Sequence, residues 1–114
     1  MGTTNLDTLQ VEESLILAGT ETIAAGGTTT AIDLTKQSHL IDADAGGDIF
    51  TIADGTAGQL ISIVMASATG VATITPANLL GGTSVTMNAA GETVMLQFIS
   101  GSWNIMGGNA YTVI

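Results

Sequence analysis

Two segments in the second half of the chain alternate with the period of two that is typical of β-strands. In residues 93–99, Val94, Leu96 and Phe98 share one face, and the opposite face is half apolar. Residues 60–65 are apolar on both faces in the same way. Strands that are apolar on both faces are usually buried on both faces. We therefore expect these two strands at the centre of a sandwich or at a subunit interface.

Clusters of Gly, Asn, Asp, Pro and Ser recur along the chain at the spacing of an all-β domain. Eighteen threonines and fifteen glycines also favour strands and tight turns over helices. These patterns predict an all-β fold, either a small antiparallel β-sandwich or a jelly-roll-like domain. The other predicted strands are residues 15–17, 28–34, 40–43, 48–53, 71–75, 83–87, 103–106 and 111–114.

The chain of 114 residues divides into a short N-terminal arm, residues 1–14, and a single β domain, residues 15–114. Residues 1–13 are polar, carry three acidic side chains and offer few apolar anchors. We interpret them as an extended arm that docks on another surface, with a short helix as the alternative. Two Gly-Gly-Thr sequences, at residues 26–28 and 81–83, are linked by no fixed period, so a solenoid is not expected.

Charge is distributed very unevenly along the chain. The net charge is −9, Lys36 is the only fixed cation, and there is no arginine. Nine of the ten acidic residues lie between Asp7 and Asp54, and Glu92 is the only charged side chain in the last sixty residues. Binding to nucleic acid or to an anionic membrane needs Lys and Arg, so neither partner is expected. The uncharged half is expected to be covered by the acidic half, by other copies or by a larger assembly.

Residues 42–48 are the strongest candidate for a metal site. Asp42, Asp44 and Asp48 alternate with small residues in the manner of a calcium loop. An EF-hand is excluded because Gly46 stands at the fifth position and Ala53 at the twelfth, where a glutamate is needed. The favoured interpretation is a solvated acidic turn, with no metal and no cofactor.

His39 is the only candidate for acid–base catalysis, since the chain has one histidine and no cysteine. Lys36, Asp33 and Asp42 are close to it in sequence and could orient it. The segment 35–39 nevertheless has the composition of a polar turn between two strands. We predict a surface or interface histidine, no catalytic residues and no enzyme activity.

The sequence also suggests two kinds of binding surface. Threonines at residues 28–30, with Thr73 and Thr75, suggest a flat ice-binding face, but their spacing in the sequence is irregular. A carbohydrate platform needs stacked aromatic rings, and the chain has four such residues, Phe50, Phe98, Trp103 and Tyr111. Trp103 is expected in the core or at its rim.

Four segments carry a resemblance to a known family. They are residues 54–59 with a Gly-Gln turn, 72–83 with a Thr-Pro-x-Asn-Leu loop, 89–92, and 101–105 with a Gly-x-Trp turn. Together they resemble a β-rich module of tailed-bacteriophage virion proteins, seen in phages of cyanobacteria and other marine bacteria. The likeness covers residues 48–109, and it implies a structural role with no active-site residues to transfer.

The resemblance implies a capsid decoration (cement) protein on the outer surface of a phage head. Such a protein is expected to be a homotrimer that binds the major capsid protein and stabilises the shell. The alternative is a receptor-binding or adhesin tip of a tail or head fibre. A fibre would call for repeats or a coiled-coil stalk, which the sequence does not contain.

Overall fold

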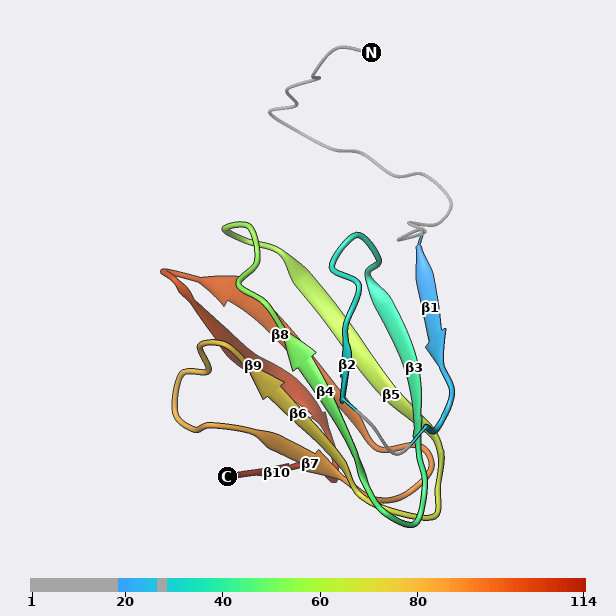
Figure 1. Cartoon of the computed structure of the whole chain (residues 1–114). Helices are drawn as coiled ribbons and strands as arrows, with labels where there is room; N and C mark the ends of the chain where they lie inside the picture. Colours follow the sequence, from blue (N-terminus) through green and yellow to red (C-terminus); the bar gives the residue numbers. More distant parts are fainter. Residues whose placement is uncertain (1–18, 27–28) are drawn as a thin grey trace, which may run out of the picture.

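The computed structural model describes residues 19–26 and 29–114. These residues form two five-stranded sheets that pack face to face, with no helix among them (Figure 1). Sheet A has the strand order β1-β3-β5-β8-β9, and sheet B has the order β10-β7-β6-β4-β2. The predicted all-β sandwich is confirmed. The strands are β1 (Thr20–Ile23), β2 (Thr29–Ala31), β3 (Ser38–Ala43), β4 (Asp48–Ile52), β5 (Leu60–Ala68), β6 (Ala72–Pro76), β7 (Val85–Met87), β8 (Thr93–Ile99), β9 (Ser102–Asn109) and β10 (Thr112–Val113).

The first six strands alternate between the two sheets, and neighbours within each sheet run parallel. The chain thus winds as a short coil, with one strand of each turn in sheet A and the next in sheet B. The sequence did not predict this winding, because it has no fixed period. The turns of the coil are unequal. Thr20 lies beside Ser38 and Ser38 beside Ser62, so the offsets are 18 and 24 residues. Loops of different length absorb the difference, which is why the winding leaves no fixed repeat in the sequence.

Antiparallel pairing is confined to the C-terminal part. It joins β6 to β7, β7 to β10, β5 to β8 and β8 to β9. The prediction of an antiparallel sandwich therefore holds for these four ladders and is wrong for the other four. The physical reason is that Gly-rich turns also connect strands in opposite sheets. Turn composition does not reveal which sheet the next strand joins.

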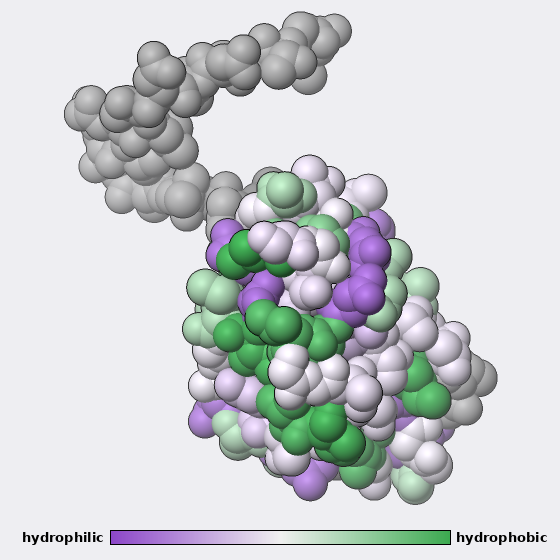
Figure 2. All heavy atoms as spheres, turned by 90° about the vertical axis from the view of Figure 1, so that its left-hand side faces the viewer, coloured by the Kyte–Doolittle hydropathy of each residue, from purple (hydrophilic) through white to green (hydrophobic). Residues whose placement is uncertain are grey.

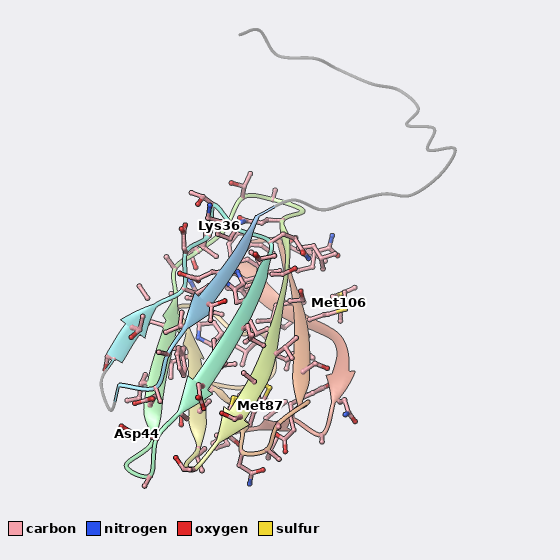
Figure 3. All side chains as sticks on the ribbon, turned by 90° about the vertical axis from the view of Figure 1, so that its right-hand side faces the viewer. Lys36, Asp44, Met87 and Met106 are labelled. Atoms are coloured by element: carbon pink, nitrogen blue, oxygen red, sulfur yellow. The ribbon has the colours of Figure 1, made fainter. Side chains whose placement is uncertain are left out.

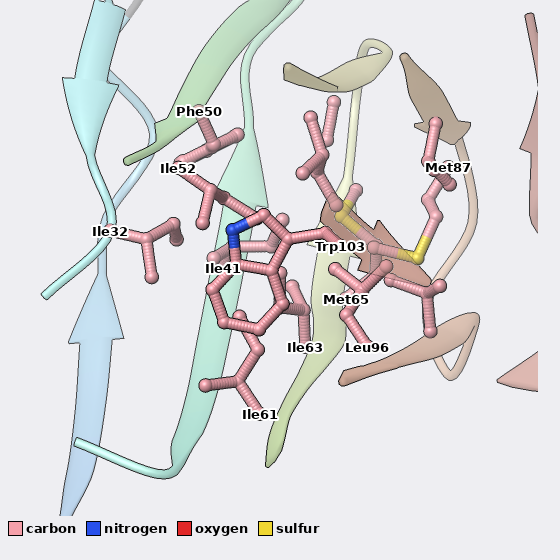
Figure 4. Packing of buried hydrophobic residues seen from close by; sticks show 14 of the residues in the cluster. Ile32, Ile41, Phe50, Ile52, Ile61, Ile63, Met65, Met87, Leu96 and Trp103 are labelled. Carbon is pink, nitrogen blue, oxygen red and sulfur yellow. The ribbon is translucent and has the colours of Figure 1, made fainter. Parts of the chain in front are cut away.

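The core lies between the inner faces of the two sheets. Ile41, Ile63 and Leu96 from sheet A meet Phe50 and other apolar side chains from sheet B, and all of these are buried. Figure 4 shows the indole of Trp103 among these side chains. The expectation of a core position for Trp103 is therefore confirmed.

Strand positions agree closely with the alternation in the sequence. The strand β8 has its predicted bounds, and eight further predicted strands overlap observed ones. The strand β1 was missed, because Glu21 stands at an inward position and hides the alternation. The predicted strand at residues 15–17 and the predicted arm lie outside the described residues.

Burial on both faces of β5 and β8 is not observed within one chain. Both strands alternate between buried inward residues and outward residues that stay accessible. Met95, on the outward face of β8, is 39% exposed. The second apolar face of these strands therefore remains open to a partner.

Candidate interaction surface

The outer face of sheet A collects apolar side chains at its centre. The strand register places Leu40 of β3 beside Val64 of β5, and Met95 of β8 lies opposite Ser62 of β5. The strands β3, β5 and β8 are the three central strands of the sheet. Hydroxyl and amide side chains surround this centre, and they include those of Thr20, Thr22, Ser38, Ser102 and Asn104. An apolar centre with a polar rim is the usual composition of a protein–protein interface.

Charge is nearly absent from this face. Among the described residues, Asp42 is the only charged side chain that alternation places on the outer face of sheet A, and its Oδ2 accepts a hydrogen bond from the Ser67 hydroxyl. Glu92, the only charged side chain of the last sixty residues, is buried. Its carboxylate accepts the backbone N–H of Asn88 and so closes the turn before β8. The C-terminal half therefore presents no charged side chain at its surface.

The apolar surface extends to the edge of sheet A at β9. Met106 is 54% exposed and projects from β9 away from the body of the protein (Figure 3). Leu80, 66% exposed, lies next to this strand, because its backbone N–H donates to the carbonyl of Trp103. A Cβ added to Gly82 would stand 2.6 Å from Cγ1 of Val113 and 2.9 Å from the carbonyl oxygen of Ile114. The C-terminal residues therefore adjoin the loop that holds Leu80. Figure 2 shows hydrophobic side chains gathered on this side of the molecule.

A hollow of about 290 Å³ lies beside β1 on sheet A. Its lining consists of Thr20, Thr22, Ser38, Leu40 and Val64 together with the pair Glu21 and His39. Such a mainly apolar hollow, beside the apolar centre of the sheet, is suited to receive a side chain of a partner.

His39 is not a surface residue, and that prediction was wrong. Its side chain has no exposed area and points into the core from β3. Its Nδ1 lies 2.7 Å from Oε1 of Glu21, a residue of β1 that the sequence reasoning did not connect with it. The link arises from the parallel register, which sets Glu21 directly beside His39.

The residues that are close to His39 in the sequence do not assemble around it. Asp33 instead accepts the hydroxyl and the backbone N–H of Thr35 through Oδ1. These two hydrogen bonds hold the pKa of Asp33 below its usual value of 3.8, the hydroxyl contributing most. Glu21 and His39 thus lie together, and Asp33 joins them through its backbone N–H, which donates to Glu21, and not through its carboxylate.

The acidic segment 42–48 forms a turn whose carboxylates accept backbone N–H groups. Oδ1 of Asp44 accepts the N–H of Gly46, and Oδ2 of Asp48 accepts the N–H groups of Asp44 and Gly26. Oδ1 of Asp48 is buried and has no hydrogen-bond partner among the described residues. No group of three or more potential metal-binding side chains occurs in residues 19–26 and 29–114.

The outer face of sheet B is rich in threonine. Registers across the sheet place one outward residue of every strand in a single row: Thr29, Ile49, Thr73, Thr86 and Thr112. A shorter row holds Ala31, Thr51 and Thr75. The irregular spacing in the sequence is thus compensated in space, although Ile49 and Ala31 interrupt the rows. Residue 28 lies outside the described part.

The aromatic residues form no surface platform. Phe50, Phe98 and Trp103 are buried, and Tyr111 is half-buried against the core. Phe98 and Trp103 pack edge to face with ring centroids 5.2 Å apart. Trp103 Nε1 donates to the carbonyl of Ala53 at 2.9 Å.

Comparison of the chain with known proteins does not assign it to a family. Among the described residues there is no helix long and apolar enough to cross a membrane. No protein-family model matches the chain, and no curated protein is significantly similar to it. The outer face of sheet A with its β9 edge, where exposed apolar side chains gather among the described residues, is the candidate functional site.

Proposed function

We propose that this protein is a structural virion protein, a decoration protein that binds the outer surface of a phage head as a homotrimer and stabilises the shell. The observation that carries the proposal is the nearly uncharged outer face of sheet A, with its apolar centre, in a chain of net charge −9. The resemblance of residues 48–109 to virion modules supports the same role. The partner is the major capsid protein, and no chemistry is involved.

The charge distribution suits an outward position on a particle that contains DNA. Asp44 and Asp54 lie in the loops that follow β3 and β4 and not on a strand of sheet A. Repulsion between these carboxylates and phosphate groups opposes binding to nucleic acid. The same carboxylates keep the particle surface hydrated.

Stabilisation by such a protein is a mass-action effect. A ligand that binds only the assembled shell stabilises that state by RT ln(1 + L/Kd) for each site, where L is the free concentration of the ligand, so the effect grows with that concentration. The requirement is a complementary surface and not a reactive group. A rigid two-sheet body with a neutral face meets this requirement.

The test is to add the purified protein to heads that lack it and to measure the temperature at which DNA escapes. We expect the protein to bind the heads saturably and to raise the temperature at which DNA escapes from them. Unchanged escape temperature, with loss of host adsorption on removal of the protein, would contradict it and support the fibre tip instead.

A further inference from the structure

We infer that the thioether sulfurs of Met95 and Met106 are the oxidation sites of this protein, and that their conversion to sulfoxides weakens binding by the outer face of sheet A. The oxidant is a two-electron oxygen donor such as hydrogen peroxide. The inference rests on the proposed function and deepens it, because it names a modification that regulates the face proposed to bind the head.

Exposure divides the methionines of the described residues into two pairs. Met65 and Met87 are each 1% exposed and lie in the core between the sheets (Figure 4). Met95 and Met106 are 39% and 54% exposed. Met1, the fifth methionine, lies outside the described residues, and the chain has no cysteine whose thiol would compete for the oxidant. An oxidant in water therefore reaches the sulfurs of Met95 and Met106 before those of the core.

The two exposed sulfurs belong to neighbouring strands of the candidate surface. Met95 stands on the outward face of β8, where its register partners are Ser62 of β5 and Gly107 of β9. Met106 directly precedes Gly107, where the β8–β9 ladder shifts its register. Oxidation of both residues therefore changes the centre and the β9 edge of the same surface.

The reaction needs no catalytic group from the protein, because the thioether is itself the nucleophile. A lone pair of the sulfur attacks one oxygen of hydrogen peroxide, an S–O bond forms and the O–O bond breaks. The sulfur loses two electrons, which the peroxide gains. The second oxygen leaves as hydroxide and takes the proton of the transferred hydroxyl group. The products are one methionine sulfoxide and one water.

A sulfoxide changes what the face offers to a partner. The thioether is apolar, whereas the sulfoxide is polar and chiral. Burial of its oxygen without a hydrogen-bond donor costs free energy, and the apolar side chains of Leu40 and Val64 on the same face supply no donor. The hydroxyl of Ser62, opposite Met95, is already directed to Oγ of Ser38 at 3.4 Å. The oxidised face therefore retains water when a partner approaches.

The modification acts on the free protein. Both sulfurs are accessible in the free chain, whereas a head bound to this face would cover them. Methionine sulfoxide is reduced back to methionine by dedicated reductases, so the change is reversible. Oxidation therefore regulates how many free copies are able to bind and leaves bound copies unchanged.

Leucine variants separate the effect of the sulfur from that of the shape. Met95→Leu and Met106→Leu keep an apolar side chain of similar volume and remove the atom that takes up oxygen. Neither residue belongs to the core, so the circular dichroism spectrum should not change. The double variant is therefore the matched control for each treatment with peroxide.

The first experiment treats the purified full chain with hydrogen peroxide and follows each methionine by peptide mass spectrometry. We expect Met95 and Met106 to gain one oxygen atom roughly tenfold faster than Met65 and Met87, because a buried sulfur reacts only when the fold opens locally. Unfolding in urea before the treatment should remove this difference. Equal rates in the folded chain, or faster oxidation of Met65 and Met87, would overturn the assignment of the sites.

The second experiment measures binding to heads that lack the protein. Oxidised wild type should bind roughly tenfold more weakly than untreated wild type, and treatment with a methionine sulfoxide reductase should restore the affinity. The double leucine variant should keep its affinity after the same peroxide treatment. Unchanged binding of the oxidised wild type, or an equal loss in the leucine variant, would overturn the inference.

Retention on a hydrophobic-interaction column is a readout that needs no heads. Oxidised wild type should elute earlier than untreated wild type, and peroxide should not shift the double leucine variant. Unchanged elution of the oxidised wild type would refute the inference and leave the proposed function intact. Failure of the untreated protein to bind heads would refute the proposed function alone, because the oxidation rates and the elution still decide the inference.

Discussion

Glu21 and His39 connect three segments of the chain through one carboxylate oxygen. Oε1 of Glu21 lies 2.7 Å from Nδ1 of His39 and accepts the backbone N–H of Asp33 at 3.1 Å. The imidazole is fully buried, and the side chain of Glu21 is 20% exposed. The edge strand β1 is thus tied both to β3 and to the segment that follows β2.

Removal of this carboxylate should destabilise the fold. Glu21→Ala leaves the buried Nδ1 of His39 and the N–H of Asp33 without an acceptor, at a cost of about 1–3 kcal/mol. Glu21→Gln keeps an acceptor oxygen and should lose less. Urea unfolding of the three proteins measures the difference. Equal stability of Glu21→Ala and the wild type would show that the pair contributes nothing.

Local alternation predicted most strands but not the pairing between them. The bounds of β8 followed from Val94, Leu96 and Phe98, which depend only on neighbours in the sequence. The pair of Glu21 and His39 depends on parallel pairing of β1 with β3, eighteen residues apart. No local feature of either strand encodes that register, so the sequence predicted a surface histidine.

The candidate surface was partly predictable, because local alternation revealed its apolar residues but not their neighbours on adjacent strands. The apolar residues on both faces of residues 60–65 and 93–99 indicated a strand that needs cover on both sides. The structure shows that one chain covers only the inner face. Val64 and Met95 lie on neighbouring strands only because β5 pairs with β8, which the sequence did not specify. The location of the apolar centre of sheet A therefore required the topology.

The pKa of Asp33 should respond to Thr35. The Thr35 hydroxyl is the main cause of the lowered pKa, so Thr35→Val should raise the pKa toward 3.8, with the backbone hydrogen bond retained. A lowered folded-state pKa stabilises the protein above pH 3.8, and this contribution is lost as the pH falls through the folded-state value. Titration of the carboxyl by NMR measures the shift. Thr86→Val, on sheet B, is the control and should leave the Asp33 titration unchanged.

Calcium should not stabilise the described fold. The carboxylates of Asp44 and Asp48 already accept backbone N–H groups of their own turn and of Gly26. Calcium takes six to eight oxygen ligands, and the described residues bring together no group of three or more potential metal-binding side chains. The melting temperature should therefore be equal in millimolar calcium and in a chelator. A rise of several degrees with calcium, abolished by Asp48→Asn, would contradict this prediction.

Stacking of successive turns should make Gly70 irreplaceable. Gly70 lies in the turn between β5 and β6, and an added Cβ would stand 1.7 Å from the carbonyl oxygen of Asp44, in the turn between β3 and β4. The two turns lie together at one end of the molecule (Figure 1), joined by the hydrogen bond from Asp48 N–H to the carbonyl of Val71.

Gly70→Ala must therefore separate two hydrogen-bonded turns of the coil, at the cost of about 1–3 kcal/mol or more that overpacking carries. Gly46→Ala is the matched control, since its added Cβ would meet only Oδ1 of Asp44, at an ordinary 3.5 Å. Thermal and urea unfolding should show a large loss for Gly70→Ala and little change for Gly46→Ala. Because this close approach exists only if β3–β4 and β5–β6 are stacked coils, equal stability of the two variants would argue against the parallel winding itself.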